Sequence, residues 1–506
     1  MSNSLINFNK DSLKLLFGLK LKKIREAQSL SLKDFSEKLQ LSPSYLNEIE
    51  KGKKYPKLDK IVEISSKLGI DFNSLVSNSL EHEFTFLSEM MNSPLIKSFP
   101  FELFGLTLRD LFELITNDIE KAGAFIQTIL NLVRDYDMKT ESFYLSALKA
   151  YQEMHNNYFP NLEEKALEFR EKCNLSADNI FDSKTLERLL SNVYNYQIIE
   201  TDFSDYPDLN EFRSIIAKGS INKLYINCTL SEPQKNFILA RELGYCYLKL
   251  QERALTSSWL KVESFEQVLN NFKASYFAGA LLLNKEILEK DLKKFFKSKK
   301  WDGNAFLELI EKYKTTPETF LYRLSELIPE IMGIKQIHYL RFSNNPNTNR
   351  YNLTKGLNMS KILIPQGIAL SEHYCIRWLS VKLLKKLAEE QKNSIDNPCI
   401  ISTQRSKMKH NQKESEFFCI TVAFKESTSN SNISITLGFN LNEQFKKEIK
   451  FWNDPNIEDD FINSTCERCE ELNCFLRVAP PIIKEIELNF EKTNKALNIF
   501  LENVKK

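Results

Sequence analysis

The chain is 506 residues long, which is more than one hydrophobic core supports, so we expect three or four domains. Its 69 Lys and Arg residues almost balance its 67 Asp and Glu residues, which excludes a generally basic nucleic-acid-coating protein. No apolar run reaches 18 residues, and the first ten, MSNSLINFNK, lack an apolar signal core. We therefore predict no membrane span. Nine cysteines in so long a chain do not resemble a secreted disulfide framework, which favours a cytoplasmic protein.

Residues 19–60 have the pattern of a helix-turn-helix DNA-binding unit. Leu21 and Arg25 lie on the inner face of a first helix, and Ser31 followed by Asp34 begins a second helix in the manner of a capping box. Ser42 then caps a third helix with Pro43 at its first position. This third helix is predicted to be the recognition helix.

The exposed start of a recognition helix enters the major groove, and nearby lysines contact phosphates. The stretch carries 11 Lys and Arg against 6 Asp and Glu, which favours DNA over the alternative of a helical bundle that binds only proteins. The predicted DNA-binding residues are Ser42, Pro43, Ser44, Asn47, Glu48, Lys51, Lys53 and Lys54.

Residues 19–76 resemble the Cro/C1-type helix-turn-helix family. Members pair an Arg of the first helix with a Glu at the end of the recognition helix, and those positions are Arg25 and Glu50 here. This chain departs from the family at two positions. Leu32 stands where members often have Gln near the start of the second helix, and Gln40 stands where members have Gly in the turn.

The rest of the chain divides by its hydrophobic pattern. Residues 77–95 are a predicted linker, and 106–172 repeat apolar residues at helical steps, which makes this segment our candidate for dimerisation. Strands are predicted at 196–201 and 223–227. Helices follow at 233–250, 272–283 and 317–327. Beyond Gly333, strand signals dominate up to a last helix at 484–505.

The predicted helix around 237–248 carries Arg241-Glu242-Leu-Gly-Tyr245. A zinc peptidase needs His-Glu-x-x-His on such a helix, with both His as ligands and Glu activating water. The region resembles the metallopeptidase domains that cleave bacterial repressors, whose acidic third ligand would fall near Asn271. Because Arg241 and Tyr245 occupy the ligand positions, we predict a pseudo-enzyme domain kept for binding, with no catalytic residue. The five His residues show no ligand spacing.

The C-terminal segment contains Cys466-x-x-Cys469-x-x-x-x-Cys474. Two cysteines three positions apart form a chelating turn, a third can close over the same ion, and Cys375 is the best candidate for a fourth ligand. Spacing alone does not separate zinc from an iron–sulfur cluster. The remaining cysteines are predicted to be small core residues; they are Cys173, Cys228, Cys246, Cys399 and Cys419.

Together, the helix-turn-helix, the degenerate peptidase-like region and the terminal CERCEELNCFLRVAPP resemble the short-chain fatty-acyl-CoA-responsive transcriptional regulators. The resemblance implies control of gene expression by acyl-CoA or CoA, and a [4Fe–4S] cluster on Cys375, Cys466, Cys469 and Cys474. It assigns no effector-binding residues. The implied partners are a double-stranded DNA operator and a second copy of the chain in a homodimer.

The expected fold is therefore multidomain. We predict an all-α helix-turn-helix domain at 1–78, a helical connector at 79–172, an α+β degenerate zincin-like domain at 173–332, and a strand-rich, Cys-containing α+β effector-binding domain with a metal or Fe–S site at 333–506. Two alternatives stay open. One is a zinc-stapled DNA-binding regulator that responds to a protein partner, and the remote one is a metallopeptidase that cleaves a repressor.

Overall fold

The computed structural model describes residues 10–76, 99–106, 128, 139–175, 180–256, 262–348, 350–364, 372–393, 399–410 and 413–504. The chain forms two compact units, Met1–Ala147 and Leu148–Lys506. Helix α10 (Thr140–Met154) crosses the boundary between them. The predicted linker at 77–95 and most of 106–138 lie outside the described residues.

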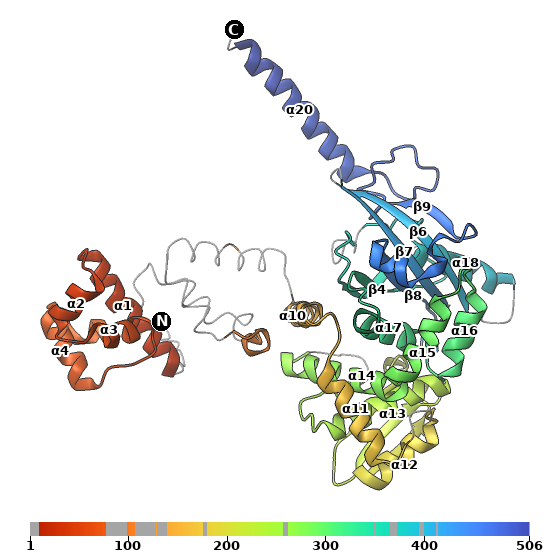
Figure 1. Cartoon of the computed structure of the whole chain (residues 1–506), viewed down its shortest axis with the longest axis horizontal. Helices are drawn as coiled ribbons and strands as arrows, with labels where there is room; N and C mark the ends of the chain where they lie inside the picture. Colours follow the sequence, from red (N-terminus) through yellow and green to blue (C-terminus); the bar gives the residue numbers. More distant parts are fainter. Residues whose placement is uncertain are drawn as a thin grey trace. The chain divides into compact units, whose positions relative to one another are not determined.

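The first unit is all-α where it is described (Figure 1). Its helices are α1 (Lys10–Ala27), α2 (Leu32–Leu39), α3 (Pro43–Glu50), α4 (Leu58–Leu68) and α5 (Phe72–Val76), followed by the 3-10 helix η2 (Phe101–Phe104). Phe35, Leu46 and Ile49 are fully buried in the core that these helices share. The predicted helix-turn-helix is confirmed in its helix order, in the starts of α2 and α3 and in its buried faces, whereas α1 begins at Lys10, before the predicted start at residue 19.

The second unit begins with a layer of helices over a three-stranded sheet. Helices α11 (Pro160–Lys172) and α12 (Ser183–Tyr194) precede β1 (Tyr196–Thr201), 3-10 helix η3 (Pro207–Leu209), β2 (Ser214–Ala217) and β3 (Asn222–Asn227). The strand order is β1-β3-β2, with β1 parallel and β2 antiparallel to β3. The predicted strands at 196–201 and 223–227 are present, whereas β2 was missed because only four residues form it.

Five helices follow. They are α13 (Glu232–Tyr247), α14 (Phe265–Leu282), α15 (Lys285–Phe296), α16 (Gly303–Lys312) and α17 (Pro317–Ile331). Ser231 and Gln234 form a capping box that begins α13. A Cβ on Gly244 would lie 2.9 Å from the carbonyl oxygen of Ala274, so this glycine lets α13 pack closely against α14.

The C-terminal half is built on a six-stranded sheet with the order β5-β4-β8-β7-β6-β9. Its strands are β4 (Ile337–Asn344), β5 (Tyr351–Asn358), β6 (Ile400–His410), β7 (Lys413–Lys425), β8 (Asn432–Asn440) and β9 (Glu458–Ile462). The pair β6–β9 is parallel and the other pairs are antiparallel.

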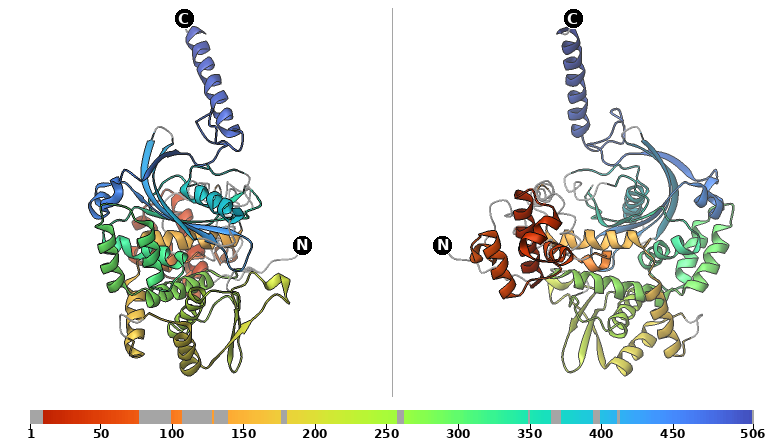
Figure 2. Two further views of the ribbon diagram at one scale, coloured as in Figure 1. Left: turned by 90° about the vertical axis from the view of Figure 1, so that its right-hand side faces the viewer. Right: turned by 60° about the vertical axis from the view of Figure 1, so that its left-hand side comes forward.

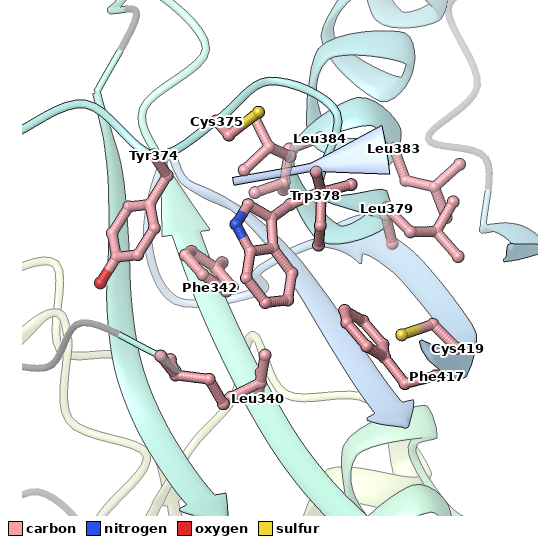
Figure 3. Packing of buried hydrophobic residues seen from close by; sticks show 14 of the residues in the cluster. Leu340, Phe342, Tyr374, Cys375, Trp378, Leu379, Leu383, Leu384, Phe417 and Cys419 are labelled. Carbon is pink, nitrogen blue, oxygen red and sulfur yellow. The ribbon is translucent and has the colours of Figure 1, made fainter. Parts of the chain in front are cut away.

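Both faces of this sheet are covered. Helix α18 (Leu379–Asn393) lies along one face, where Trp378 packs near Phe342 and Phe417 (Figures 2 and 3). On the other face, Phe418 contacts Phe445 of α19 (Glu443–Glu448) and the 3-10 helix η5 (Lys450–Asn453). Burial on both faces explains why β7 and β8 read as nearly continuous apolar runs.

The chain ends in α20 (Ile482–Val504), a 23-residue helix that extends away from the sheet (Figures 1 and 2). None of the helices within the described residues is long and apolar enough to cross a membrane.

Candidate functional sites

The recognition helix α3 is ordered by local chemistry. The Ser42 hydroxyl accepts a hydrogen bond from the backbone N–H of Tyr45, and Pro43 occupies the first turn. Gln40 takes a left-handed conformation at φ 55°, which turns the chain between α2 and α3 as the sequence predicted. Ser44 is exposed and Asn47 is half-buried at the outer face, so both are placed to meet a groove.

An Arg–Glu pair holds this helix to α1. Nε and Nη2 of Arg25 donate to the two carboxylate oxygens of Glu50 at 2.8 and 2.9 Å, and Nη1 donates to the carbonyl oxygen of Leu30. The hydrogen bond to Glu50 raises the pKa of Arg25. This confirms the pairing that the resemblance implied, and it fixes the end of α3 through a partner 25 residues away.

Two of the predicted DNA-binding residues are paired with each other. Nζ of Lys54 lies 2.7 Å from a carboxylate oxygen of Glu48, and it also lies 5.8 Å from the centre of the Tyr45 ring. Lys51 and Lys53 are exposed and form no ion pair within the described part of the chain. The free positive charge beside the recognition helix therefore comes mainly from Lys51 and Lys53.

Sequence reasoning missed Gly18. A Cβ there would lie 2.1 Å from the carbonyl oxygen of Ile49 and 2.9 Å from that of Glu50. Because both atoms are backbone, α1 and the end of α3 can approach this closely only at a glycine. No local pattern marks this position, since the contact joins residues far apart in sequence.

On α13, Glu242 and Tyr245 of the degenerate peptidase motif belong to a buried network of hydrogen bonds and ion pairs. Glu242 is only 2% exposed, accepts a hydrogen bond from Tyr196 Oη at 2.7 Å, and forms a two-point ion pair with Arg253, whose Nη2 lies 2.6 Å away. Tyr245 Oη donates to Asn271 at 3.2 Å, and the Arg253 guanidinium lies 3.8 Å from the Tyr245 ring centre. Arg253 was missed because it follows the helix in a loop.

This network leaves Glu242 without a free oxygen for a water molecule. Both of its oxygens bind Arg253, and burial together with the Glu242 charge raises the pKa of Tyr196, which keeps that phenol protonated as a donor. Of the positions that the resemblance assigns to zinc ligands, Tyr245 is thus hydrogen-bonded to Asn271, whereas Arg241 faces the pocket described next.

A pocket of about 260 Å³ opens beside the same helix and within the larger unit. It is lined by α13, α14, α17, β5 and the residue before β2. Its charged lining residues are Arg213, Arg241, Glu318, Arg323, Glu326 and Lys355. Sequence reasoning assigned no effector-binding residues, because these elements come together only in the fold.

Most of these charges are neutralised by neighbours. Arg323 binds both oxygens of Glu163 at 2.7 Å, and burial raises the pKa of Glu326 to about 8. Arg213 lies 3.1 Å from Glu426. Arg241 is different: its Nε is buried and has no hydrogen-bond partner in the described structure, and burial lowers the pKa of its guanidinium.

The four predicted cysteine ligands lie in one neighbourhood at the end of the six-stranded sheet. The backbone N–H of Cys375 donates to Ser464, that of Cys466 donates to His373, and Tyr374 bridges to Thr465. Cys375, Cys466 and Cys469 are buried, and Cys474 is half-buried. Cys375 begins the turn into Trp378, whose Nε1 donates to Asn463 at 2.9 Å (Figure 3).

Electrostatics couple these thiols. Burial raises the pKa values of Cys375 and Cys469, and the neighbouring cysteines raise them further. Arg377 Nη2 lies 3.9 Å from the sulfur of Cys474. No group of three or more His, Cys, Asp or Glu side chains has metal-binding geometry among the described residues. The four cysteines lie on two hydrogen-bonded segments, and thiolates are the donors that zinc and iron–sulfur clusters take, so the fit is one of donor chemistry and not of sulfur geometry.

The other cysteines were predicted to be core residues, and this is wrong for two of them. Cys419 is buried, and Cys173 and Cys246 are half-buried, but Cys228 and Cys399 are exposed. Each of the exposed pair lies at a strand end, Cys228 after β3 and Cys399 before β6, where the chain leaves the sheet.

Two segments match known families. Residues 21–75 match the family described as helix-turn-helix, and residues 195–325 match the family described as IrrE N-terminal-like domain. These matches confirm two domains of the predicted multidomain fold. The second covers both the Arg241–Tyr245 motif and most of the pocket lining.

Among curated proteins, the chain is 23% identical to the propionyl-CoA carboxylase regulator of Cereibacter sphaeroides over 286 residues. The match covers 53% of this chain, which spans 57% of the length of that regulator. Among solved structures, a Mycobacterium tuberculosis transcriptional regulator matches with a TM-score of 0.43 and 17% identity, covering 66% of this chain and 92% of that one. By its helix-turn-helix match and its curated relative, the chain is similar to DNA-binding transcriptional regulators.

Proposed function

We propose that this protein is a DNA-binding transcriptional regulator controlled by a short-chain acyl-CoA. The observation that carries the proposal is the helix-turn-helix itself, in which a capped recognition helix is held by the Arg25–Glu50 pair with its polar side outward. The choice of effector is supported by the similarity to a propionyl-CoA carboxylase regulator and by the resemblance of the C-terminal cysteine segment.

DNA binding is best served by two copies. Helix-turn-helix dimers place their recognition helices in successive major grooves about 34 Å apart on approximately palindromic sites. In this arrangement Ser44 and Asn47 read base edges, while Lys51 and Lys53 contact phosphates. Glu48 and Lys54 neutralise each other, so their contribution to DNA affinity is smaller than that of the two free lysines.

We further propose that the IrrE-like domain has no peptidase activity. A guanidinium offers no lone pair to zinc, and both oxygens of Glu242 are engaged by Arg253 and Tyr196. The domain retains the scaffold of a cleft and Glu242, but it lacks the zinc ligands, and its Glu242 is held in an ion pair. Its remaining use is to bind a ligand and pass that binding on to the DNA-binding unit.

Cys375, Cys466, Cys469 and Cys474 would hold a [4Fe–4S] cluster or, alternatively, zinc. Such a centre would supply four metal–sulfur bonds between segments that otherwise meet through backbone hydrogen bonds and through the Glu372–Arg468 and His373–Glu467 contacts. We assign this centre a structural role. Trp378 binds the chain just after β9, and Arg377 places a positive charge beside the sulfur of Cys474.

The DNA-binding proposal is tested by selecting binding sites from random duplexes and measuring affinity for the selected site with and without propionyl-CoA. Ser44→Ala with Asn47→Ala should relax the sequence preference, at a cost of roughly 1–3 kcal/mol per lost base contact. Ser66→Ala with Asn73→Ala, which alters exposed polar residues on α4 and α5, is the matched control. Unchanged specificity of the first variant, or affinity that ignores propionyl-CoA at all concentrations, would contradict the proposal.

The metal proposal is tested on protein purified without oxygen. Iron with acid-labile sulfide would support the iron–sulfur cluster, whereas one zinc per chain would support a structural zinc site. Cys469→Ser should lose the metal and Cys246→Ser, a half-buried cysteine on α13, should keep it. Equal metal content in the two variants would remove Cys469 from the ligand set.

A further inference from the structure

We propose that the pocket beside α13 binds an anionic group, a carboxylate or a phosphate, through Arg241. The proposal rests on the function above, because it identifies where an anionic effector of the regulator would be recognised. The guanidinium stands at the position where the resembling peptidases place a zinc ligand, so a protein cation replaces the metal cation as the charge that faces the cleft.

The charge balance of the pocket carries the argument. Arg323 is matched by Glu163, with the Glu326 carboxyl as a further acceptor at 3.0 Å, and Arg213 together with Arg341 is matched by Glu318 and Glu426. Arg241 has no ion pair in the described part of the chain, and its buried Nε donates to nothing there. A guanidinium N–H that is buried without an acceptor is costly, and an anion entering the pocket would remove that cost.

The surroundings of Arg241 also suit a ligand. Asn271, Ser275 and Thr319 supply neutral hydrogen-bonding side chains, while Phe237 and Ile238 supply an apolar wall. Lys355, whose Nζ lies 3.6 Å from the Tyr322 ring centre, adds a second cation that forms no direct ion pair within the described structure. At 260 Å³ the pocket is slightly smaller than common ligand pockets of roughly 300–1,000 Å³, so it accepts a small anion or the end of a larger molecule.

Thermal unfolding of the full chain tests this site with four probes: propionate, inorganic phosphate, coenzyme A and propionyl-CoA. We expect at least one to raise the Tm of the wild type by about 2 °C or more at saturation. Arg241→Met should abolish that shift, and it should also raise the Tm of the ligand-free protein, because it removes an unpaired buried cation. Arg188→Gln, on the exposed face of α12, is the control and should change neither.

The outcomes are distinct. If no probe stabilises the wild type, if Arg241→Met keeps the shift, or if Arg241→Met lowers the ligand-free Tm, Arg241 has a structural role and the site is wrong. Phosphate binding without acyl-CoA binding keeps the anion site and overturns the acyl-CoA effector. Operator affinity that still responds to propionyl-CoA in Arg241→Met keeps the regulator and moves its effector site elsewhere.

A second inference concerns α20, and a separate observation carries it. We infer that α20 pairs with α20 of a second copy of this chain. Apolar side chains and one threonine recur at alternating steps of three and four residues along the helix, at Ile483, Ile486, Phe490, Thr493, Leu497 and Phe500. This is the spacing of a coiled-coil seam, whose natural partner is a helix with the same spacing.

The exposed apolar side chains of α20 and the residues that flank them favour a second copy of this helix as its partner. Ile486, Phe490 and Phe500 are 69%, 67% and 62% exposed, which is unusual for a large apolar surface on one helix. In a parallel, in-register pair, the residues flanking the seam would be Asn489 beside Asn494 and Ala496 beside Leu501. No like charges face each other in these pairs, so self-association meets no electrostatic opposition along most of the helix.

Sedimentation velocity of the full chain tests the pairing. Ile486→Glu with Leu497→Glu should shift the wild-type dimer toward monomer by at least tenfold in dissociation constant, whereas Lys492→Glu with Lys495→Glu, on the outer side of the helix, should not. Leu497→Cys should crosslink to itself on oxidation, because identical seam positions meet in a parallel pair. A monomeric wild type, or a dimer that the seam variant leaves intact, overturns the inference.

Discussion

The helix-turn-helix and the larger unit handle charge in opposite ways. The first buries one Arg–Glu pair and leaves its other cations at the surface beside the recognition helix. The second buries the Glu242–Arg253 and Arg323–Glu163 pairs, the ring of His338, and the Nε of Arg241, which has no hydrogen-bond partner among the described residues. Surface cations respond to salt, whereas buried groups respond to pH and to bound ligands. The division suits a protein that reads DNA with one part and a small molecule with the other.

The largest expected effect follows from breaking the Glu242–Arg253 pair. Arg253→Met leaves Glu242 buried without its cation, which should cost about 3–5 kcal/mol of unfolding free energy. The double variant Glu242→Leu with Arg253→Met should recover most of that loss, since no uncompensated charge remains. Urea denaturation measures both variants. A small loss in the single variant would show that the pair does not hold the former peptidase centre together.

His338 tests the expected pH response of the larger unit. Burial lowers its pKa to about 3, so the folded protein binds its proton less readily than the unfolded chain does, in which the pKa is near 6.5. Its contribution to stability is full above pH 6.5 and is lost as pH falls toward 3. Between pH 6.5 and 5 this loss amounts to about 2 kcal/mol. His338→Gln should flatten that part of the stability profile, and an unchanged slope would assign the acid sensitivity to other groups.

Gly18 tests how closely the helix-turn-helix is packed. Gly18→Ala places a methyl group against the carbonyl oxygens of Ile49 and Glu50, and the resulting strain should cost about 1–3 kcal/mol. The shifted end of α3 should also weaken operator binding. Gly219→Ala, which meets only one atom at 3.5 Å, is the control. Wild-type operator affinity in Gly18→Ala would mean that α3 tolerates displacement at its end.

Lys53 gives the smallest effect and the sharpest contrast with the buried charges. Lys53→Ala should weaken binding to all DNA sequences alike and reduce the slope of log affinity against log salt concentration by about 1. Lys33→Ala, on α2, keeps the net-charge change and serves as the control. If the slope does not change, Lys53 contacts no phosphate.

The two regions also differ in how far the sequence predicts them. Ser31, Ser42 and Pro43 act within one turn of their own helices, so the bounds of α2 and α3 follow from local chemistry. Arg253 reaches Glu242 from a loop, and Lys355 reaches the pocket from β5, so neither role leaves a periodic trace. Strands β5 and β6 were missed because polar residues interrupt their apolar pattern, whereas β7 and β8 read as nearly continuous apolar runs.

The hydrogen bond between Trp378 and Asn463 bears on the order in which the C-terminal half folds. This hydrogen bond joins residues that are 85 positions apart, and strands β6, β7, β8 and β9 all lie between them in the sequence. Contacts of such long sequence separation form late, because the intervening loop must first be closed. A nascent chain released before residue 463 would display Cys375 alone, whereas the four cysteines would gather only when the last strand has docked. Any inserted metal would then report that synthesis and folding of the C-terminal half are complete.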